Sequence, residues 1–253
     1  MQQKSIGVYP KWDDYARRAG PWRRFRAKIL PVHVYKPLVG EFHLAMLRFR
    51  TIGLAAKYKG SKDLLINVGC GANGLPGWVN VDGFPSKNVN CVCDCRKKLP
   101  FPDRSARGIF SEHFFEHLDY TDEVPSFLEE CLRVLQPGGV IRLVVPDAGK
   151  YLHAYCAEGW TDLAQLRGLD GQRRDGWMQC AYNTKMELIN TVFRQGSEHK
   201  WAYDAETLCF LLSYFGFADP HPRGYRQSQL PELAIDLEVR KPESLYVEAR
   251  KGS

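Results

Sequence analysis

The sequence predicts a Rossmann-like, three-layer α/β domain with a mostly parallel sheet and an antiparallel last strand. Short apolar segments such as "LLINV" (64–68) and "VIRLVVP" (140–146) are continuous rather than alternating in polarity, and each runs into Gly or Asp. Continuous apolar strands are typical of parallel sheets buried on both faces. The tail "ESLYVEARK" (243–251) alternates instead, which favours an antiparallel strand at the end of the chain.

Three more short strands are predicted at 78–82, 89–94 and 108–111. A helix is predicted from about Asp122 to Leu135, because Thr121 is a good N-cap residue and acidic side chains follow it in the first turn. The helix ends at "QPGG", and the strand at 140–146 follows. Strands that alternate with helices predict crossover connections and a parallel sheet.

The chain divides into a basic helical arm or lid, residues 1–60, and a domain, residues 61–253. Residues 1–62 hold 14 Lys/Arg and three acids, a balance of +11, whereas the whole chain carries +6. The arm segments "WDDYARRA" and "PWRRFRAKIL" each predict a short helix, and apolar spacing predicts a longer amphipathic helix over 38–58.

Composition indicates a globular protein, with 44% hydrophobic and 25% charged residues. The apolar runs are shorter than a membrane span, and the first residues lack the apolar core of a signal peptide. Eight cysteines without a secretory signal favour reduced thiols over disulfides. We therefore expect a cytoplasmic protein, with peripheral contact at the inner membrane surface through the basic arm left open.

A glycine loop follows the first strand of the domain. "NVGCGANG" places Gly69, Gly71 and Gly74 where tight turns let a backbone approach a nucleotide cofactor. Asp82 ends the second strand only 13 residues beyond Gly69, and Asp94 ends the third. A dinucleotide site would place its ribose-binding acid about 20 residues on, which disfavours a nicotinamide cofactor. Two successive strand-end acids fit the ribose and adenine of an adenosine.

With these motifs, residues 64–147 resemble the class I S-adenosylmethionine-dependent methyltransferases, specifically the type 11 group. The matching segments are "LLINVGCGANGLPGWVNVD", "CDCRKKLPFPDRSARGIFSEHFFEHL" and "FLEECLRVLQPGGVIRLVVPD". The "EHKWAYDAETLCFLLSYFGF" segment resembles the C-terminal helix of this group, and "SLYVEARK" its final strand. The resemblance covers about 60–248 and leaves the basic arm outside it.

The resemblance implies S-adenosylmethionine as cofactor and gives roles to individual residues. The glycine loop would hold the methionine part, Asp82 the ribose, and Asp94 with Cys95 the adenine. Ser111 and His113 would close over the cofactor. The full set implied for the cofactor is Asn67, Gly69, Cys70, Gly71, Asp82, Asp94, Cys95, Ser111 and His113.

Three positions depart from the pattern of the group. Asn67 stands where many members carry an acid near the amino group of the cofactor. Arg107 stands where an Asp is usual before the fourth strand. Residues 69–77 are also short for a parallel crossover, which usually needs a dozen or more residues, so at most a turn or two of helix is expected there.

The expected reaction is methyl transfer, and we favour O-methylation. The protein must place a nucleophile in line with the sulfonium methyl group, and a hydroxyl nucleophile benefits from a general base. The candidates are His113 and His153, with Asp147 and His199 behind them. A non-catalytic cofactor-binding or scaffold protein is the alternative, supported by Asn67 and the short crossover; a nicotinamide-dependent oxidoreductase ranks last.

The expected acceptor is a small molecule or a glycan- or lipid-linked hydroxyl, and the arm favours an acidic one. Aromatic and arginine residues interleave in the arm, which suits an anionic membrane surface or an acidic acceptor. Nucleic acid is disfavoured because the domain carries no base-reading motif. The sequence leaves the identity of the acceptor and the oligomeric state open.

Two motifs suggest metal chemistry, and no metal is predicted from either. "HFFEH" has the spacing of an inverted zinc-protease motif, His113-x-x-Glu116-His117. A catalytic zinc needs a third protein ligand, and no partner spacing stands out, so orienting or capping roles are favoured. "CVCDC" places Cys91, Cys93 and Cys95 on one face of a strand, where packing in the core is the favoured interpretation.

Overall fold

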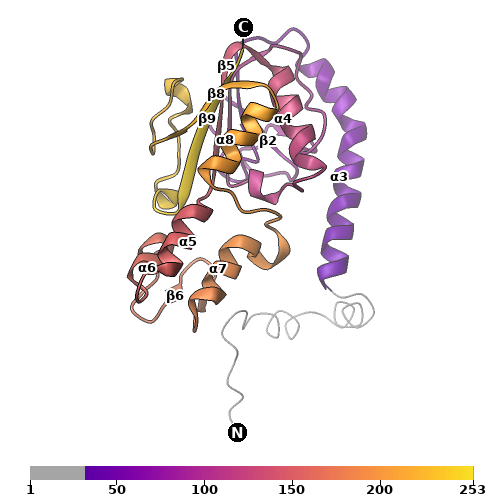
Figure 1. Ribbon diagram of the computed structural model, residues 1–253. Coiled ribbons are helices and arrows are strands. Elements are labelled where there is room, and N and C mark those ends of the chain that lie inside the picture. Colours follow the sequence, from indigo (N-terminus) through magenta and orange to yellow (C-terminus); the bar gives the residue numbers. More distant parts are fainter. Residues whose placement is uncertain (1–31, 253) are drawn as a thin grey trace.

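The computed structural model describes residues 32–252 (Figure 1). The two short helices predicted in the arm fall before residue 32 and lie outside the described residues. The 38–58 helix is present as α3 (Val32–Lys57), which begins six residues earlier than expected.

The domain is built on a seven-stranded sheet with the order β3-β2-β1-β4-β5-β9-β8. Strands β1 to β5 pair in parallel, and β9 pairs antiparallel with both β5 and β8. The predicted mostly parallel sheet with an antiparallel last strand is therefore confirmed. The strands are β1 (Leu64–Val68), β2 (Val79–Asp82), β3 (Cys91–Val92), β4 (Ala106–Glu112), β5 (Leu135–Pro146), β8 (Phe217–Arg223) and β9 (Ser244–Lys251).

Helices cover one face of this sheet. α4 (Glu123–Val134) and α8 (Ala205–Tyr214) pack on the side chains that β1, β4 and β5 direct to that face, and together they form the main core. The predicted N-cap of α4 is wrong by one residue: Asp122 occupies that position, while the Thr121 hydroxyl donates to Asp119.

The opposite face is covered by the long segment 224–243 between β8 and β9. This segment contains the 3-10 turns η3 (Pro231–Leu233) and η4 (Glu238–Arg240). Arg142 of β5 anchors it, since its fully buried guanidinium donates to Asp236, and a neighbouring salt bridge joins Arg142 to Glu248. Arg107, expected before the fourth strand, lies inside β4 and pairs with Glu232 of the same segment. Its role is therefore to hold this cover in place.

An insertion between β5 and α8 forms a cap with its own small core. It contains α5 (Ala148–Cys156), α6 (Thr161–Arg167), the hairpin β6 (Arg174–Asp175) and β7 (Cys180–Ala181), α7 (Lys185–Arg194) and the 3-10 turn η2 (Gln195–Ser197). In Figure 1 the cap lies beyond the end of the sheet where β5 leads into α5. Tyr151, Leu163, Tyr182 and Leu188 are among its buried side chains.

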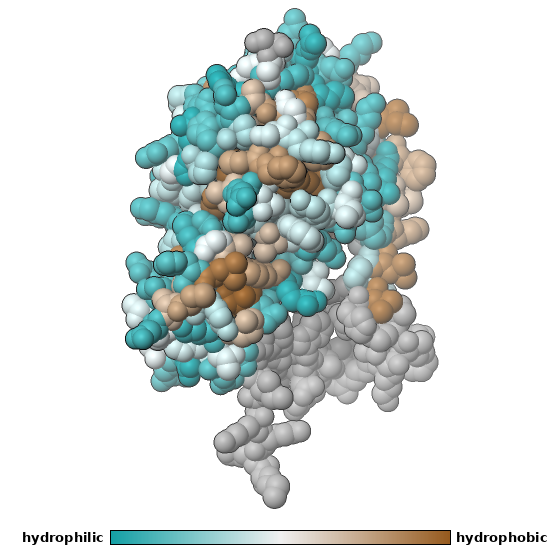
Figure 2. Space-filling view, in the orientation of Figure 1, coloured by the Kyte–Doolittle hydropathy of each residue, from teal (hydrophilic) through white to brown (hydrophobic). Residues whose placement is uncertain are grey.

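Helix α3 lies against the β2–β3 side of the domain by one flank only. Leu47 is buried, and Leu54 packs at the edge of the main core. The apolar stripe that defined this helix in the sequence, Leu38, Phe42, Met46, Phe49 and Ile52, is exposed and appears brown at the right of Figure 2. No described helix is long and apolar enough to cross a membrane.

The connection from β1 to β2 contains no helix within the described residues. Residues 69–78 form turns and extended chain. The expectation of at most a turn or two is thus confirmed, and the ends of β1 and β4 are left open beside the glycine loop.

Candidate cofactor site

A cavity of about 160 Å³ lies at the carboxyl ends of β1 and β4. Open α/β sheets bind ligands at this edge. Ligand pockets usually measure roughly 300–1,000 Å³, so this one fits part of a nucleotide-sized cofactor. It brings together five of the residues predicted from the sequence, namely Asn67, Gly69, Cys70, Gly71 and His113.

The first glycine of the loop is required by close packing. Gly69 has a φ of +70°, and an added Cβ would collide with the Phe114 side chain. Gly71 also has a positive φ, but a Cβ there would meet no atom within 4 Å. The loop therefore packs tightly against the β4 loop at Gly69 and leaves free space at Gly71, as a cradle for a ligand requires.

Asp82 holds the glycine loop in place. Its Oδ2 accepts a hydrogen bond from the Gly71 amide at 2.8 Å, and its Oδ1 accepts one from Phe84 at 2.9 Å. The carboxylate is half-buried. Both oxygens keep a lone pair for a further donor, because a carboxylate accepts about four hydrogen bonds. Its ribose-binding role remains a prediction.

Asp94 and Cys95 lie apart from this cavity. Asp94 is only 2% exposed, and salt bridges join its carboxylate to Arg48 of α3 and to Arg96. Burial opposes ionisation, but the Arg96 guanidinium outweighs it and keeps the pKa of Asp94 below its usual value. Cys95 is buried in the main core. Contact of these two residues with adenine stays a prediction, since Arg48 and Arg96 already occupy the carboxylate.

A larger hollow of about 480 Å³ lies between α3 and residues 97–100. Asp94 and Arg48 line it, and the glycine loop does not. The glycine loop and the strand ends line the smaller cavity instead, which makes that cavity the candidate cofactor site.

His113 lies just past the end of β4, as predicted. Its φ of +53° is uncommon for a non-glycine residue. Nε2 lies 3.0 Å from the Ser244 hydroxyl, and Nδ1 lies 3.3 Å from a carboxylate oxygen of Glu116. The ring is therefore held from both sides at the rim of the cavity.

The other predicted catalytic candidates do not line this cavity. Asp147 is the N-cap of α5 and accepts a hydrogen bond from the Lys150 amide. His153 is exposed on α5. His199 lies on the far side of Glu116. Ser111, predicted to close over the cofactor, is fully buried within β4, and its hydroxyl has no hydrogen-bond partner among the described residues.

Seven lining residues were missed from the sequence, and three of them, Glu112, Leu237 and Arg240, bear on the chemistry of the site. Glu112 accepts a hydrogen bond from the Leu237 amide, and burial raises the pKa of this carboxyl. Leu237 and Arg240 come from the segment 224–243. Glu112 could have been suspected from its place at a strand end, whereas nothing in the sequence connects Arg240 with the glycine loop.

A second cavity of about 360 Å³ adjoins the first and shares Arg240 with it. The cap contributes Trp177, whose ring centroid lies 5.1 Å from the guanidinium group of Arg167 and 4.6 Å from that of Arg240. Arg167 is fixed by Asp175 and Glu243. Charged side chains line this cavity together with apolar ones, and the Trp177 side chain is 57% exposed.

The "CVCDC" thiols and the tyrosines near the cap have structural positions. Cys91 and Cys93 are buried in the main core, in agreement with the packing interpretation. Tyr203 is buried there too, against Phe115. Tyr151 is buried in the cap core, and its hydroxyl donates to Glu243.

Comparison with known proteins agrees with the resemblance. The family model described as "Methyltransferase domain" matches residues 77–143. A malonyl-[acyl-carrier protein] O-methyltransferase of Coxiella burnetii is 43% identical over 116 residues. That match covers 40% of this chain and 40% of the relative, so the chain matches well under half of the length of that protein.

Two solved structures are also similar at low identity. A SAM-dependent methyltransferase from Archaeoglobus fulgidus is 20% identical with a TM-score of 0.43, covering 92% of this chain and all of that one. The 1,6-didemethyltoxoflavin-N1-methyltransferase of Burkholderia thailandensis is 12% identical with a TM-score of 0.43, covering 87% and 89%. The family model and the curated relative are both methyltransferases, and both agree with the resemblance of residues 64–147 to the class I, S-adenosylmethionine-dependent methyltransferases.

Proposed function

We propose that this chain transfers the methyl group of S-adenosylmethionine to an oxygen atom of a small-molecule or saccharide-type acceptor. The observation that supports the proposal most is the glycine loop, which Asp82 fastens beside a cavity at the strand ends of a methyltransferase domain. The Coxiella burnetii relative is an O-methyltransferase, which favours oxygen as the accepting atom.

Methyl transfer depends mainly on how the protein positions the acceptor oxygen relative to the methyl group. The sulfonium methyl group is intrinsically reactive, and an in-line approach of the acceptor oxygen supplies much of the rate enhancement. When the oxygen belongs to a hydroxyl, its proton must leave as the new C–O bond forms. His113 at the rim of the cavity is the proposed acceptor of that proton, and Glu112 lies beside it with a raised pKa.

The second cavity is the proposed acceptor site. It shares Arg240 with the cofactor cavity, so an acceptor held there would extend toward the methyl group. An aromatic face flanked by hydrogen-bonding groups suits a sugar ring, whose C–H face packs on aromatic rings while its hydroxyls need polar partners. Trp177→Ala should therefore raise the KM for a hydroxyl acceptor and leave S-adenosylmethionine affinity unchanged.

The exposed stripe of α3 supports a second, finer proposal, peripheral contact with an anionic lipid surface. Phe49 is 77% exposed and Ile52 79%, on α3, the helix of the strongly basic arm that the structure describes. Apolar side chains backed by basic residues suit the interface of an anionic bilayer. Co-sedimentation with phosphatidylserine vesicles, lost in Phe49→Ser and absent with neutral vesicles, would support it; equal sedimentation with both would oppose it.

The cofactor assignment is tested by calorimetric titration with S-adenosylmethionine. Hydrogen bonds to a charged group contribute about 1.5–3 kcal/mol, so Asp82→Ala should weaken binding about ten- to a hundredfold. Asp82→Asn, which keeps an acceptor for the Gly71 amide, should lose less. Asp122→Ala, an exposed acid with no capping hydrogen bond, is the matched control and should bind like the wild type.

The alternatives separate in the same assay. Binding of NAD without S-adenosylmethionine would favour an oxidoreductase. Binding of S-adenosylmethionine without formation of S-adenosylhomocysteine, across a panel of hydroxyl acceptors and any acceptor that copurifies, would favour a non-catalytic cofactor-binding protein.

A further inference from the structure

A buried carboxylate lies at the centre of the "HFFEH" motif, and its nearest ion-pair contact is His113 Nδ1 at 3.3 Å. Glu116 belongs to the 3-10 turn η1 (Phe115–His117) and is 1% exposed. Neither of its side-chain oxygens has a hydrogen-bond partner among the described residues. A buried charge without compensation is costly, so such groups are normally paired or bound to a metal.

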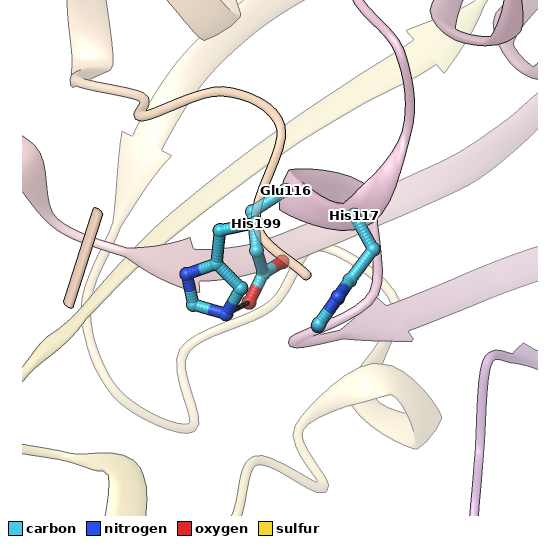
Figure 3. A group of neighbouring side chains, drawn as sticks. All are labelled: Glu116, His117 and His199. Carbon is cyan, nitrogen blue, oxygen red and sulfur yellow. Dashed lines mark ion pairs between the residues drawn. The ribbon is translucent and has the colours of Figure 1, made fainter. Parts of the chain in front are cut away.

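Two histidines face this carboxylate from different parts of the chain (Figure 3). His117 is the next residue of the same turn. His199 follows the cap helix α7, and the amides of Lys200 and Trp201 donate to the Glu116 backbone oxygen. The returning chain of the cap is thereby fixed beside Glu116, and it supplies the third group that the sequence motif lacked.

Both imidazoles direct Nδ1 to a backbone carbonyl oxygen. His117 Nδ1 lies 3.1 Å from the Glu198 carbonyl oxygen, and His199 Nδ1 lies 2.6 Å from that of Val192. A carbonyl only accepts, so each Nδ1 carries the proton and each neutral ring keeps its lone pair on Nε2. Metal-binding histidines are oriented in this way, with the second ring nitrogen donating to a carbonyl or a carboxylate.

We propose that Glu116, His117 and His199 bind one first-row divalent transition metal ion, of which Zn²⁺ is the type. Their ligand atoms lie within 4.8 Å of one another. Ligand atoms about 2.1 Å from a tetrahedral ion are about 3.4 Å apart. Side-chain movements of about 1 Å would therefore bring the three ligand atoms to this separation. Two imidazoles favour zinc, iron, cobalt or nickel over magnesium and calcium, which prefer oxygen ligands.

A purely structural role for the cluster fits the geometry less well. His199 Nε2 is 3.9 Å from the nearest Glu116 oxygen, too far for a hydrogen bond. The rings of His117 and His199 meet edge to face at 4.7 Å between centroids, a separation at which two charged imidazoles would repel each other.

The site lies next to the cofactor cavity. His113 lines that cavity, and its Nδ1 is 3.3 Å from a Glu116 oxygen, so it contacts both sites. Three protein ligands leave a fourth position open, as in catalytic rather than structural zinc sites. If the proposed function is correct, that position can take the acceptor oxygen and lower its pKa; the binding of the ion itself does not depend on this.

The test is a titration of chelator-treated full-length protein with Co²⁺, in which visible absorption reports binding. Zn²⁺ is then added to measure competition for the same site. Wild-type protein should bind one equivalent and show the intense bands of four-coordinate Co²⁺. Glu116→Gln and His199→Gln should each bind at least tenfold more weakly. His221→Gln is the matched control, because this histidine also places Nδ1 on a carbonyl oxygen, that of Asp219.

His117→Gln is a second ligand variant, chosen because His117 is less buried than Glu116 and its replacement should disturb folding less. Circular dichroism with thermal unfolding should confirm that the variant is folded. Wild-type binding no stronger than that of the folded Glu116 and His117 variants would overturn the proposal. No S-adenosylmethionine or acceptor is present in the titration, so its outcome is independent of whether methyl transfer is correct.

Discussion

Asp94 and Glu116 are both buried carboxylates, and their surroundings differ completely. Asp94 is surrounded by donors: the side chains of Arg48 and Arg96 reach its oxygens at 2.8 and 2.9 Å. Glu116 has histidine rings near it and no hydrogen bond to its side chain among the described residues. The Asp94 carboxylate belongs to the ion-pair network that fixes α3 to the sheet. The Glu116 carboxylate accepts no hydrogen bond from the described residues.

A ligand is expected at a buried carboxylate that has no hydrogen-bond donors of its own. A satisfied buried ion pair tolerates no further ligand without losing its partners, whereas an unsatisfied one gains from a ligand. The family resemblance placed Asp94 at the cofactor and left Glu116 without a ligand. The geometry points to Glu116 rather than Asp94 as the carboxylate that is free to bind a ligand.

The largest expected effect follows from breaking the satisfied network. Arg96→Ala removes the residue that pairs with Asp94, Glu41 and Glu123. Loss of one partner of a buried pair typically costs about 3–5 kcal/mol, so we expect a destabilisation of about 3 kcal/mol by urea unfolding. Arg194→Ala, an exposed arginine on α7, should stay within about 0.5 kcal/mol of the wild type. Equal losses in both variants would contradict a structural role for the network.

The next effect concerns the unsatisfied carboxylate. With Co²⁺ at a hundredfold excess over its dissociation constant, the wild type should gain about 2.7 kcal/mol of stability. Glu116→Gln should gain nothing measurable, and without metal its stability should lie within about 1 kcal/mol of the wild type, since no hydrogen bond to the carboxylate is lost. Differential scanning fluorimetry with and without metal measures both differences. A large loss in metal-free Glu116→Gln would make Glu116 a structural residue like Asp94.

A smaller effect is expected on acidification. The folded pKa of Asp94 lies below its unfolded value of about 3.9, so the unfolded chain takes up the proton first as the pH falls. The stability that Asp94 contributes is therefore complete above about pH 5 and is lost as the pH falls through the folded pKa. Urea unfolding between pH 6 and pH 3 should show a shallower decline in Asp94→Asn than in the wild type. Parallel declines would mean that other carboxyls dominate.

The smallest effect is expected for Arg48→Met. Arg48 reaches Asp94 from α3, but its side chain is 41% exposed, and water screens it. Pairs of this kind contribute up to about 1 kcal/mol, so the loss should be a fraction of that in Arg96→Ala. Thermal unfolding of the two variants side by side measures the ratio. A loss as large as that of Arg96→Ala would show that docking of α3 depends on Arg48 instead.

Much of the sheet could be predicted because local pattern decides it. "LLINV" forms β1 with the predicted bounds, and the apolar run 140–146 lies within β5. Strand β8, "FADPHPR", was missed because two prolines and several polar residues hide it, and its pairing with β9 alone makes it a strand.

The candidate site was predictable only where its residues lie close together in sequence. Asn67, Gly69, Cys70 and Gly71 share a single loop, and their meeting in one cavity followed from the motif. The approach of His199 to Glu116, 83 positions away, depends on how the cap returns to the sheet. Segments far apart in sequence meet through tertiary packing, which no local periodicity encodes.

The helix-free connection between β1 and β2 has an electrostatic consequence. A helix beginning after the glycine loop would place about half a positive charge near the carboxylate of a bound amino-acid moiety. In this chain the guanidinium in the cavity lining is that of Arg240, from the segment before β9. Cofactor affinity is therefore linked thermodynamically to the docking of that segment: whatever releases residues 224–243 from the sheet should also release the cofactor, and bound cofactor should slow amide exchange there.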